Sequence, residues 1–364
     1  MAQTSFHQSI VSPQSFSDNP VFKAGGNSAL PQDKLSQIAH VRDKVRQLLW
    51  KLVVATFLLM AIGSATRVMN AGLACPDWPL CYGTLFPAQQ MNLQVFLEWI
   101  HRLDASFIGL MTIGLVGFSI WQRSDLPKWL PWTSMLALIL VCVQGGLGAL
   151  TVTALLRFDI VTAHLGTALC FFGLLLGMAI ALMPLPEESR LPHLDRKVNE
   201  TNGELLSMAP SRISQWFIGL SVGGTLMIYG QSLTGGLVGS QWALHQCLTI
   251  AQLCAVMNSH LLGVIPSSAS ILVLSIWGWR HRSDVDPLLQ RLIQLSGVLL
   301  CIQIGLGVAT FLLHLEVEPL TIAHQTTGAA LFGTLLCLSV RAYLIRFSGL
   351  SKKHAAFRIS TLGG

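Results

Sequence analysis

The sequence predicts an all-α integral membrane protein with eight transmembrane helices, arranged as two parallel pseudo-symmetric four-helix bundles. Three observations predict this fold: long apolar runs, a one-sided distribution of Lys and Arg, and an internal repeat. Of the 364 residues, 52% are hydrophobic and 11% are charged, whereas a soluble domain carries about 25% charged residues. A chain this poor in charge is typical of proteins that lie in a lipid bilayer.

Eight apolar runs are each long enough to cross a hydrocarbon layer, which takes roughly 20 helical residues. Because a spanning segment must satisfy its own backbone hydrogen bonds, these runs predict helices. Strands of a membrane barrel are excluded, since they are about 10 residues long and alternate in polarity. The runs lie near residues 48–67, 95–121, 130–153, 159–183, 213–237, 256–279, 289–313 and 320–344.

The runs divide the chain into an N-terminal tail, two four-helix halves, a linker and a C-terminal tail. The N-terminal tail is polar and rich in Ser, Gln and Pro, which predicts disorder, and it lacks the apolar core of a signal peptide. From Asp33, apolar residues recur at helical spacing, which predicts either an interfacial helix or an extension of the first span. The predicted segments are 1–47, 48–183, 184–212, 213–346 and 347–364.

Lys and Arg are distributed unevenly between the two sides of the predicted membrane. If the N-terminus is cytoplasmic, 20 of the 23 Lys and Arg are cytoplasmic, and only Arg67, Arg102 and Arg157 lie outside. This bias predicts that both termini are cytoplasmic, and it explains the net charge of +6 without nucleic acid as a partner. No Arg precedes Arg42, which argues against a mitochondrial transit peptide. We expect a bacterial plasma (inner) membrane protein.

The two halves resemble each other in sequence. Cys142–Gly148 (CVQGGLG) matches Cys301–Gly307 (CIQIGLG) at an offset of 159. Gly72–Leu73 matches Gly236–Leu237 at an offset of 164. Because each half has four spans, it enters and leaves on the same side, so the repeat is predicted to be parallel, with its axis along the membrane normal.

Four of the eleven histidines lie inside predicted spans: His101, His164, His260 and His324. Each is about five residues from the start of an even-numbered span, so all four are expected roughly 7–9 Å inside the outer boundary. An intramembrane His is costly and indicates function. Two imidazoles on neighbouring helices suit axial ligation of a haem iron, which pairs His101 with His164 and His260 with His324. The alternatives are interhelical hydrogen bonds and a copper or zinc site, for which further ligands are missing.

Only the first half has charged residues beside its histidine. Glu98 lies three residues before His101 on the same helix face, and Arg102 follows it, whereas Met257 and Leu261 stand at the matching positions. An intramembrane carboxylate tends to mark proton movement, so Glu98 is predicted to accept a proton or to orient His101. Arg102 is predicted to pair with Glu98 or with a haem propionate, and a purely structural Glu98–Arg102 pair is the alternative. The first half is therefore the predicted reaction site, with Glu98, His101 and Arg102 as catalytic residues, and the second half an electron-carrying site.

Two cysteine pairs lie in corresponding outer loops. Cys75 and Cys81 flank the sequence Pro-Asp-Trp-Pro-Leu, and Cys247 and Cys254 lie in the second half. Disulfides form at the outer face of a bacterial membrane because it is oxidising. Each pair is either a structural disulfide or a redox-active pair close to the haem, and the sequence does not separate the two.

Across roughly 48–346, the chain resembles the haem A synthase family. The resemblance rests on the loop Gly-Leu-Ala-Cys75-Pro-Asp77-Trp78-Pro-Leu-Cys81, on Glu98-x-x-His101-Arg102, on the Gln-x-Gly-Leu-Gly repeats, and on His164 and His324. It implies oxidation of the C8 methyl group of haem O to a formyl group, which gives haem A for cytochrome oxidase.

The resemblance also implies which half holds which haem. The N-terminal half would hold the substrate haem O with Glu98, His101 and His164, and the C-terminal half would hold haem b between His260 and His324. A haem O synthase and a membrane electron acceptor are the implied partners, and a homo-oligomer is compatible with the sequence. The chain departs from the family in its longer tail and in the absence of an Arg after His260, so any propionate contact in the second half must come from elsewhere.

Two other functions compete with this one. A bis-histidine membrane cytochrome would only move electrons to or from quinone. A transporter built on parallel repeats would leave the four histidines at one depth unexplained.

Purified protein is expected to absorb in the Soret region, because each histidine pair is predicted to ligate one haem. Absorption spectra, followed by pigment extraction and chromatography after co-expression with a haem O synthase, test this. Haem A among the pigments would support the synthase, haem b alone would support the cytochrome, and the absence of a Soret band would support the transporter.

Overall fold

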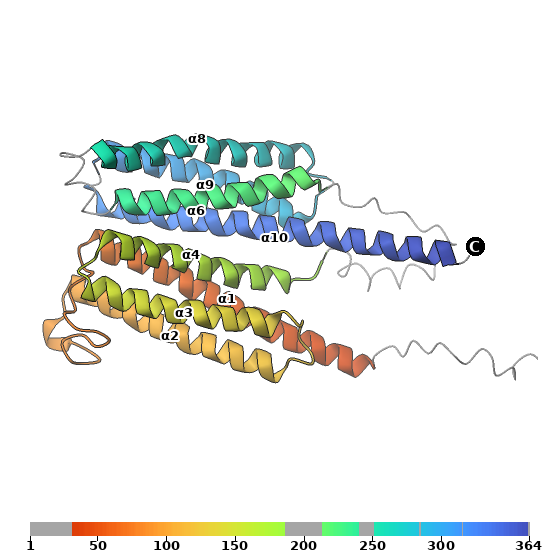
Figure 1. Cartoon of the computed structure of the whole chain (residues 1–364), viewed down its shortest axis with the longest axis horizontal. Helices are drawn as coiled ribbons and strands as arrows, with labels where there is room; N and C mark the ends of the chain where they lie inside the picture. The colour runs from red at the N-terminus through yellow and green to blue at the C-terminus, as the bar shows by residue number, and fades with distance from the viewer. Residues whose placement is uncertain (1–30, 186–212, 240–250, 284, 315, 363–364) are drawn as a thin grey trace, which may run out of the picture. The chain divides into compact units, whose positions relative to one another are not determined.

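The computed structural model describes residues 31–185, 213–239, 251–283, 285–314 and 316–362, with the backbone alone at 251–254 and 348–362. This part of the chain forms eight α-helices and one short 3₁₀ helix (Figure 1). The helices are α1 (Gln32–Val68), η2 (Ala88–Gln90), α2 (Leu93–Trp121), α3 (Leu130–Thr153), α4 (Phe158–Ala181), α6 (Gln215–Val238), α8 (Ala251–Arg280), α9 (Pro287–Leu312) and α10 (Glu318–Leu362).

The eight α-helices follow the eight predicted apolar runs. Within the described ranges, seven of them are long and apolar enough to cross a membrane, and α6 is not among these seven. The Gly, Ser, Thr and Gln residues of α6 lower its hydropathy. The all-helical structure is thus compatible with the predicted integral membrane protein, and the seven apolar helices indicate a multi-pass one.

Two helices are longer than the apolar runs that predict them. Helix α1 begins at Gln32, so the helix predicted from Asp33 is present and is continuous with the first span. Val41 and Val45 explain the extension, because they are buried one turn apart, at 6% and 0% exposure. Helix α10 continues to Leu362, through the predicted C-terminal tail. The predicted linker, apart from residues 184–185, lies outside the described residues.

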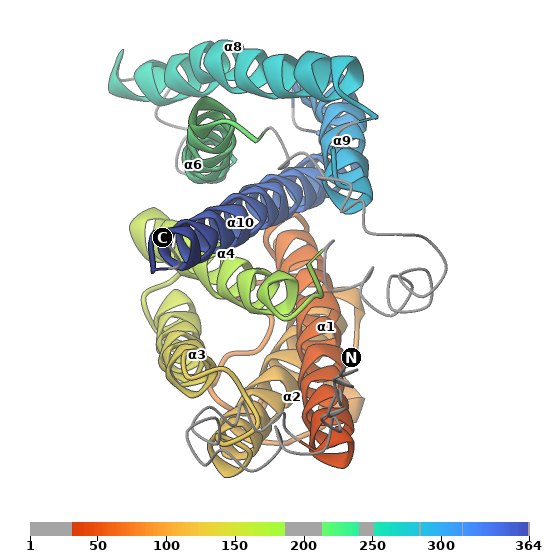
Figure 2. The ribbon, with the colours of Figure 1, turned by 90° about the vertical axis from the view of Figure 1, so that its right-hand side faces the viewer.

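Within the unit from Val41 onward, α4 and α10 lie side by side between two groups of helices (Figure 2). Helices α1, α2 and α3 lie on the α4 side, and α6, α8 and α9 lie on the α10 side. Helix α4 contacts α3, α6 and α10, and α10 contacts α9, α6 and α4. The junction between the two groups is thus formed by α4, which follows α3 in the chain, and by α10, which follows α9.

Glycines allow α4 and α10 to approach closely. A Cβ atom added at Gly333 on α10 would lie 2.9 Å from both Phe172 and Leu176 on α4. On the other side, a Cβ atom added at Gly173 would lie 3.3 Å from the ring of Phe332. Each ring therefore occupies the space above a glycine of the opposite helix, the small-residue packing that brings helices together in membranes.

A buried ion pair joins α10 to the start of α9. Arg341 Nε lies 3.3 Å from Asp286 Oδ2, and the two side chains are 5% and 7% exposed. Arg341 Nη1 also donates to the Pro184 carbonyl (3.0 Å). Asp286 is the N-cap of α9 and accepts from the Leu289 amide (3.2 Å). One arginine thus ties α9, α10 and the segment after α4 together.

The substitution Arg341→Met is expected to lower the free energy of unfolding by about 3–5 kcal/mol, because it leaves the Asp286 carboxylate buried without its partner. Adding Asp286→Asn should recover part of this loss, since the amide carries no charge and still caps α9. Unfolding in detergent measures both changes. The matched control is Arg46→Met, whose pair with Asp43 is more exposed and is worth under about 1 kcal/mol. Equal losses from Arg341→Met and Arg46→Met would contradict the assignment.

Candidate functional site

The four candidate histidines lie near the first residues of α2, α4, α8 and α10. These four helices begin at the same end of the bundle (Figure 1). His164 and His324 each follow the first residue of their helix by six residues, which is close to the predicted five. His101 follows the first residue of α2 by eight residues, and His260 follows that of α8 by nine. All four helices begin before the apolar runs that predict them, and α8 does so by the most, five residues. All four imidazoles still lie within the first three turns of their helices.

One continuous cavity of about 1260 Å³ is lined by all four histidines. Helices of both predicted halves contribute to its walls. A pocket for one drug-sized ligand usually measures about 300–1,000 Å³, so this cavity is larger than a single small ligand requires. The sequence predicts two separate pairs, and the structure brings both pairs to one cavity.

Each imidazole packs against a glycine of the preceding α-helix. The pairs, with the distance from an added glycine Cβ to the imidazole Cε1, are Gly63–His101 (2.8 Å), Gly148–His164 (3.6 Å), Gly235–His260 (2.9 Å) and Gly307–His324 (3.0 Å). At three of these positions a Cβ atom would be too close to the ring, so the glycine provides the space that the ring occupies. The sequence analysis missed this role of Gly63 and Gly235.

The same contacts correct one alignment of the sequence repeat. Gly72–Leu73 follows the end of α1, whereas Gly236–Leu237 lies inside α6, so the two pairs are not equivalent in the structure. The glycines that have the same role in α1 and α6 are Gly63 and Gly235. The short Gly-Leu motif misled the alignment because it recurs by chance near both helix ends.

Several imidazole nitrogens have no partner within the protein. The Nδ1 atoms of His101, His164 and His324 are buried without a hydrogen bond, whereas His260 Nδ1 lies 3.1 Å from Thr234 Oγ1. His101 is close enough to His164, and His324 to His260, for an electrostatic interaction. Buried polar atoms without partners are uncommon and call for an explanation. Haem iron takes one imidazole from each of two facing helices, so the two pairs of rings at the cavity fit haem. No cluster of three or more His, Cys, Asp or Glu suited to a metal ion occurs in the described part of the chain.

Two glutamines of the sequence repeat contact the segments that carry histidines. Gln144 Nε2 on α3 donates to the His164 carbonyl (3.1 Å) and to Thr167 Oγ1. Gln303 Nε2 on α9 lies 3.3 Å from His324 Nε2. These contacts join α3 to α4 and α9 to α10 beside the histidines, which is a physical reason for glutamine in both motifs.

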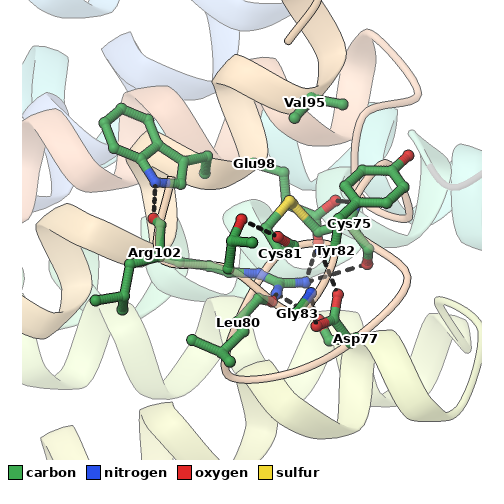
Figure 3. Close-up of a disulfide and its surroundings, with 12 residues drawn as sticks. Cys75, Asp77, Leu80, Cys81, Tyr82, Gly83, Val95, Glu98 and Arg102 are labelled. Carbon is green, nitrogen blue, oxygen red and sulfur yellow. Dashed lines mark hydrogen bonds and ion pairs between the residues drawn. A yellow bond between two sulfur atoms is a disulfide. The ribbon is translucent and has the colours of Figure 1, made fainter. Parts of the chain in front are cut away.

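Glu98 and Arg102 bind the loop that runs from Cys75 to Cys81 (Figure 3). Glu98 is 3% exposed; its Oε2 accepts from the Cys75 amide (2.8 Å), and its Oε1 accepts from Arg102 Nη2 (2.5 Å). Arg102 Nη1 donates to the carbonyls of Asp77 (2.6 Å) and Leu80 (2.5 Å). The structural Glu98–Arg102 pair considered as an alternative is therefore present. Both side chains also line the cavity, and Glu98 lies one turn before His101.

The loop itself is closed by a disulfide between Cys75 and Cys81, which are buried. Asp77 accepts from the backbone amides of Tyr82 (2.6 Å) and Gly83 (2.7 Å). The bond from the Gly83 amide is the main reason that the pKa of Asp77 lies below its usual 3.8. The disulfide leaves both a structural and a redox role open.

The second predicted cysteine pair lies outside the described residues, since the structure describes neither Cys247 nor the side chain of Cys254.

Arg67 is a residue of the cavity for which the sequence analysis gave no role. It lies in the last turn of α1 and lines the cavity, and its Nε and Nη2 atoms are buried without a hydrogen-bond partner. The sequence feature that could have pointed to Arg67 is that it is one of three arginines predicted on the outer side of the membrane.

Comparison with known proteins identifies the family of the chain. Residues 46–336 match the COX15-CtaA family, described as cytochrome oxidase assembly protein. The chain belongs to this family. The chain is 26% identical over 352 residues to a Heme A synthase of Shewanella oneidensis, covering 82% of this chain and 97% of that protein. It is 24% identical over 304 residues to a Heme A synthase of an Exiguobacterium species, covering 80% and 91%.

The predicted membership of the haem A synthase family is therefore confirmed, and so is the prediction of an oxidoreductase. A shorter match links 35% of this chain to 26% of a Protoheme IX farnesyltransferase of Haloarcula marismortui, at 30% identity over 126 residues. A haem-related substrate or cofactor follows from the family.

The disulfide loop is expected to loosen in acid through Asp77. The pKa of this carboxylate is lowered in the folded protein. Asp77 therefore contributes to the stability of the loop at any pH above its unfolded pKa. This contribution is lost as the pH falls through the folded pKa, below about pH 4. The rate of disulfide reduction by a water-soluble phosphine, followed from pH 6 to pH 3, should therefore rise at the acid end.

The substitution Asp77→Asn is the control for this measurement. It removes the charge and should give fast reduction at pH 6 with no further acid rise beyond that of the phosphine itself. Identical pH profiles for the two proteins would show that Asp77 does not hold the loop.

Proposed function

We propose that this protein is a haem A synthase that oxidises the C8 methyl group of haem O to a formyl group, giving haem A for cytochrome oxidase. The observation that carries the proposal is the cavity lined by two imidazole pairs, of which only the first has a carboxylate, Glu98, beside it, paired with Arg102. Membership of the family supports it.

In this proposal the N-terminal half holds the substrate haem O between His101 and His164, and the C-terminal half holds haem b between His260 and His324. Haem iron, when bound, supplies the redox chemistry. Conversion of a methyl to a formyl group through an alcohol replaces two C–H bonds with a C=O bond. With water as the source of the oxygen atom, it releases four protons and four electrons, and the electrons pass to an electron acceptor in the membrane. The continuity of the cavity between the two pairs supports electron passage from one half to the other.

The protein's own part is to orient the substrate and to manage protons. Gly63 and Gly148 keep the two first-half rings at fixed positions beside the helix backbones. Glu98 Oε2 accepts one N–H bond and keeps a further lone pair, so it is able to accept a proton released as the methyl group is oxidised. Arg102 balances the carboxylate charge and holds the loop against the cavity.

We propose further that the two halves, 48–183 and 213–346, are parallel pseudo-symmetric four-helix bundles. The repeated contact between a glycine and an imidazole in every helix pair supports this. Both termini are proposed to be cytoplasmic, in a bacterial plasma membrane with the haem sites near the outer face, on the evidence of the Lys and Arg distribution. A haem O synthase is the proposed partner, because it makes the substrate.

One observation favours a second function. Glu98 Oε2 and both Arg102 Nη atoms bond to backbone groups of the outer loop, and Glu98 Oε1 pairs with Arg102, as expected if the pair has only a structural role. The protein would then be a bis-histidine cytochrome that exchanges electrons with quinone.

The substitution Glu98→Gln separates the two functions. The amide still accepts from the Cys75 amide but neither takes up a proton at neutral pH nor pairs with Arg102 as an ion. We expect haem A yield to fall at least about 100-fold, the usual contribution of a general base, while the haem b content stays unchanged. Pigment extraction after co-expression with a haem O synthase measures both.

The control for Glu98→Gln is Asp159→Asn, which neutralises a carboxylate of an exposed ion pair with Arg157. It should leave the haem A yield unchanged. Normal haem A yield from Glu98→Gln would remove Glu98 from the reaction, and Glu98→Ala would then report only the loss of the loop contacts.

A further inference from the structure

Arg67 carries a buried positive charge at the edge of the cavity. Its Nε and Nη2 atoms are buried and have no hydrogen-bond partner, and no described carboxylate lies within ion-pair distance of it. The segment 240–250, which follows α6, contains no Asp or Glu. Burial of an unpaired charge is costly, so the residue points to an anionic ligand in the cavity.

The other arginines that line the described cavity already have partners. Arg102 donates to two loop carbonyls and to Glu98. Arg157 is 65% exposed and pairs with Asp159 at 2.6 Å. Arg67 is therefore the arginine of the cavity wall whose charge is available to a ligand, and the wall, where it is described, contains no lysine.

The position of Arg67 connects it to the second half of the chain. A Cβ atom added at Gly239, directly after α6, would collide with Arg67 Nη2 and would lie 3.6 Å from Gln325 Nε2. Gly239 has a φ of −78°, which any residue can adopt. A glycine is therefore needed there to leave room for the guanidinium, and not for the backbone conformation. The guanidinium of a first-half helix thus lies in a place that the second half leaves open.

Gln325 adds a second donor at this place. It follows His324 directly, and its Oε1 accepts from Ser64 Oγ (2.7 Å). This bond fixes the amide so that Nε2 faces the same region as the Arg67 guanidinium. Two hydrogen-bond donors, and no described acidic side chain, therefore meet at Gly239, next to the residue that follows His324. This arrangement suits a carboxylate.

We propose that Arg67, assisted by Gln325, binds a propionate of the haem held between His260 and His324. The inference rests on the proposed function in that it requires a haem in the second half. Guanidinium binds carboxylate through two parallel hydrogen bonds. Leu261 stands where the first half has Arg102, so the second half obtains its cation from α1 of the first.

The test compares Arg67→Gln with Arg67→Lys in protein expressed without a haem O synthase. Oxidation adds one positive charge to the haem, so the Arg67 cation disfavours the oxidised haem relative to the reduced one. The midpoint potential should therefore shift downward in Arg67→Gln and remain near the wild-type value in Arg67→Lys. Haem affinity should fall roughly tenfold or more in Arg67→Gln, as expected for a lost charged hydrogen bond. Redox titration and haem titration of the purified proteins measure these quantities.

Arg123→Gln is the control, because it removes an exposed and screened arginine that does not line the cavity. It should change neither the potential nor the haem affinity. An unchanged potential and affinity in Arg67→Gln, or equal shifts in Arg67→Gln and Arg123→Gln, would overturn the proposal.

A measurement on the wild-type protein covers the case in which Arg67→Gln does not fold. Haem b and its dimethyl ester, which lacks the carboxylates, are titrated into protein from which haem has been removed, for the wild type and for Arg67→Lys. The ester should bind at least about tenfold more weakly than haem b to both. Equal affinities would overturn the proposal. If the wild type binds no haem at all, the proposed function fails as well, and this outcome is distinct from failure of Arg67 alone.

Discussion

The close contact between each imidazole and a glycine of the neighbouring helix is the constraint on which the site depends. Without a Cβ atom on Gly63, Gly235 or Gly307, the ring of the adjacent histidine lies directly against a helix backbone. Each ring occupies the space that a larger residue would fill, and all four rings line the cavity. One packing rule, small residues where helices meet, thus sets both the fold and the position of the candidate ligands.

Much of this could be predicted from the sequence, because membrane burial acts on long segments. Apolar runs give the helices, and histidines inside them stand out since they are costly there. The helix ends were less predictable. Apolar residues at helical spacing predict a helix from Asp33, but the sequence does not show whether it is separate from the first span. The burial of Val41 and Val45 on one face keeps α1 continuous. Arg67 was not predictable as a residue of the site, because its significance comes from Gly239 and Gln325, which are distant in sequence and adjacent in space.

The Glu98–Arg102 pair has two roles, since it binds the outer loop and also lines the cavity. Glu98 and Arg102 bind backbone groups of the Cys75–Cys81 loop and also face the cavity beside His101. A change of charge or protonation at Glu98 would therefore alter the hydrogen bonds that hold the loop. In the proposed reaction, proton uptake at Glu98 is coupled to the position of the loop, because Oε2 bonds to the Cys75 amide and Oε1 bonds to Arg102, which also holds the loop.

The contacts of α1 with the second half have a consequence for the history of the chain. Ser64 bonds to Gln325, and Arg67 lies against Gly239, so α1 supplies two side chains to the other repeat. Arg67 lies four residues after Gly63, and the residue four after Gly235 is Gly239, directly after α6. The second half therefore has no arginine at this position. If the chain arose by duplication, its copies have since ceased to be interchangeable, and a protein assembled from two copies of the second half would lack the cation that the first half lends to it.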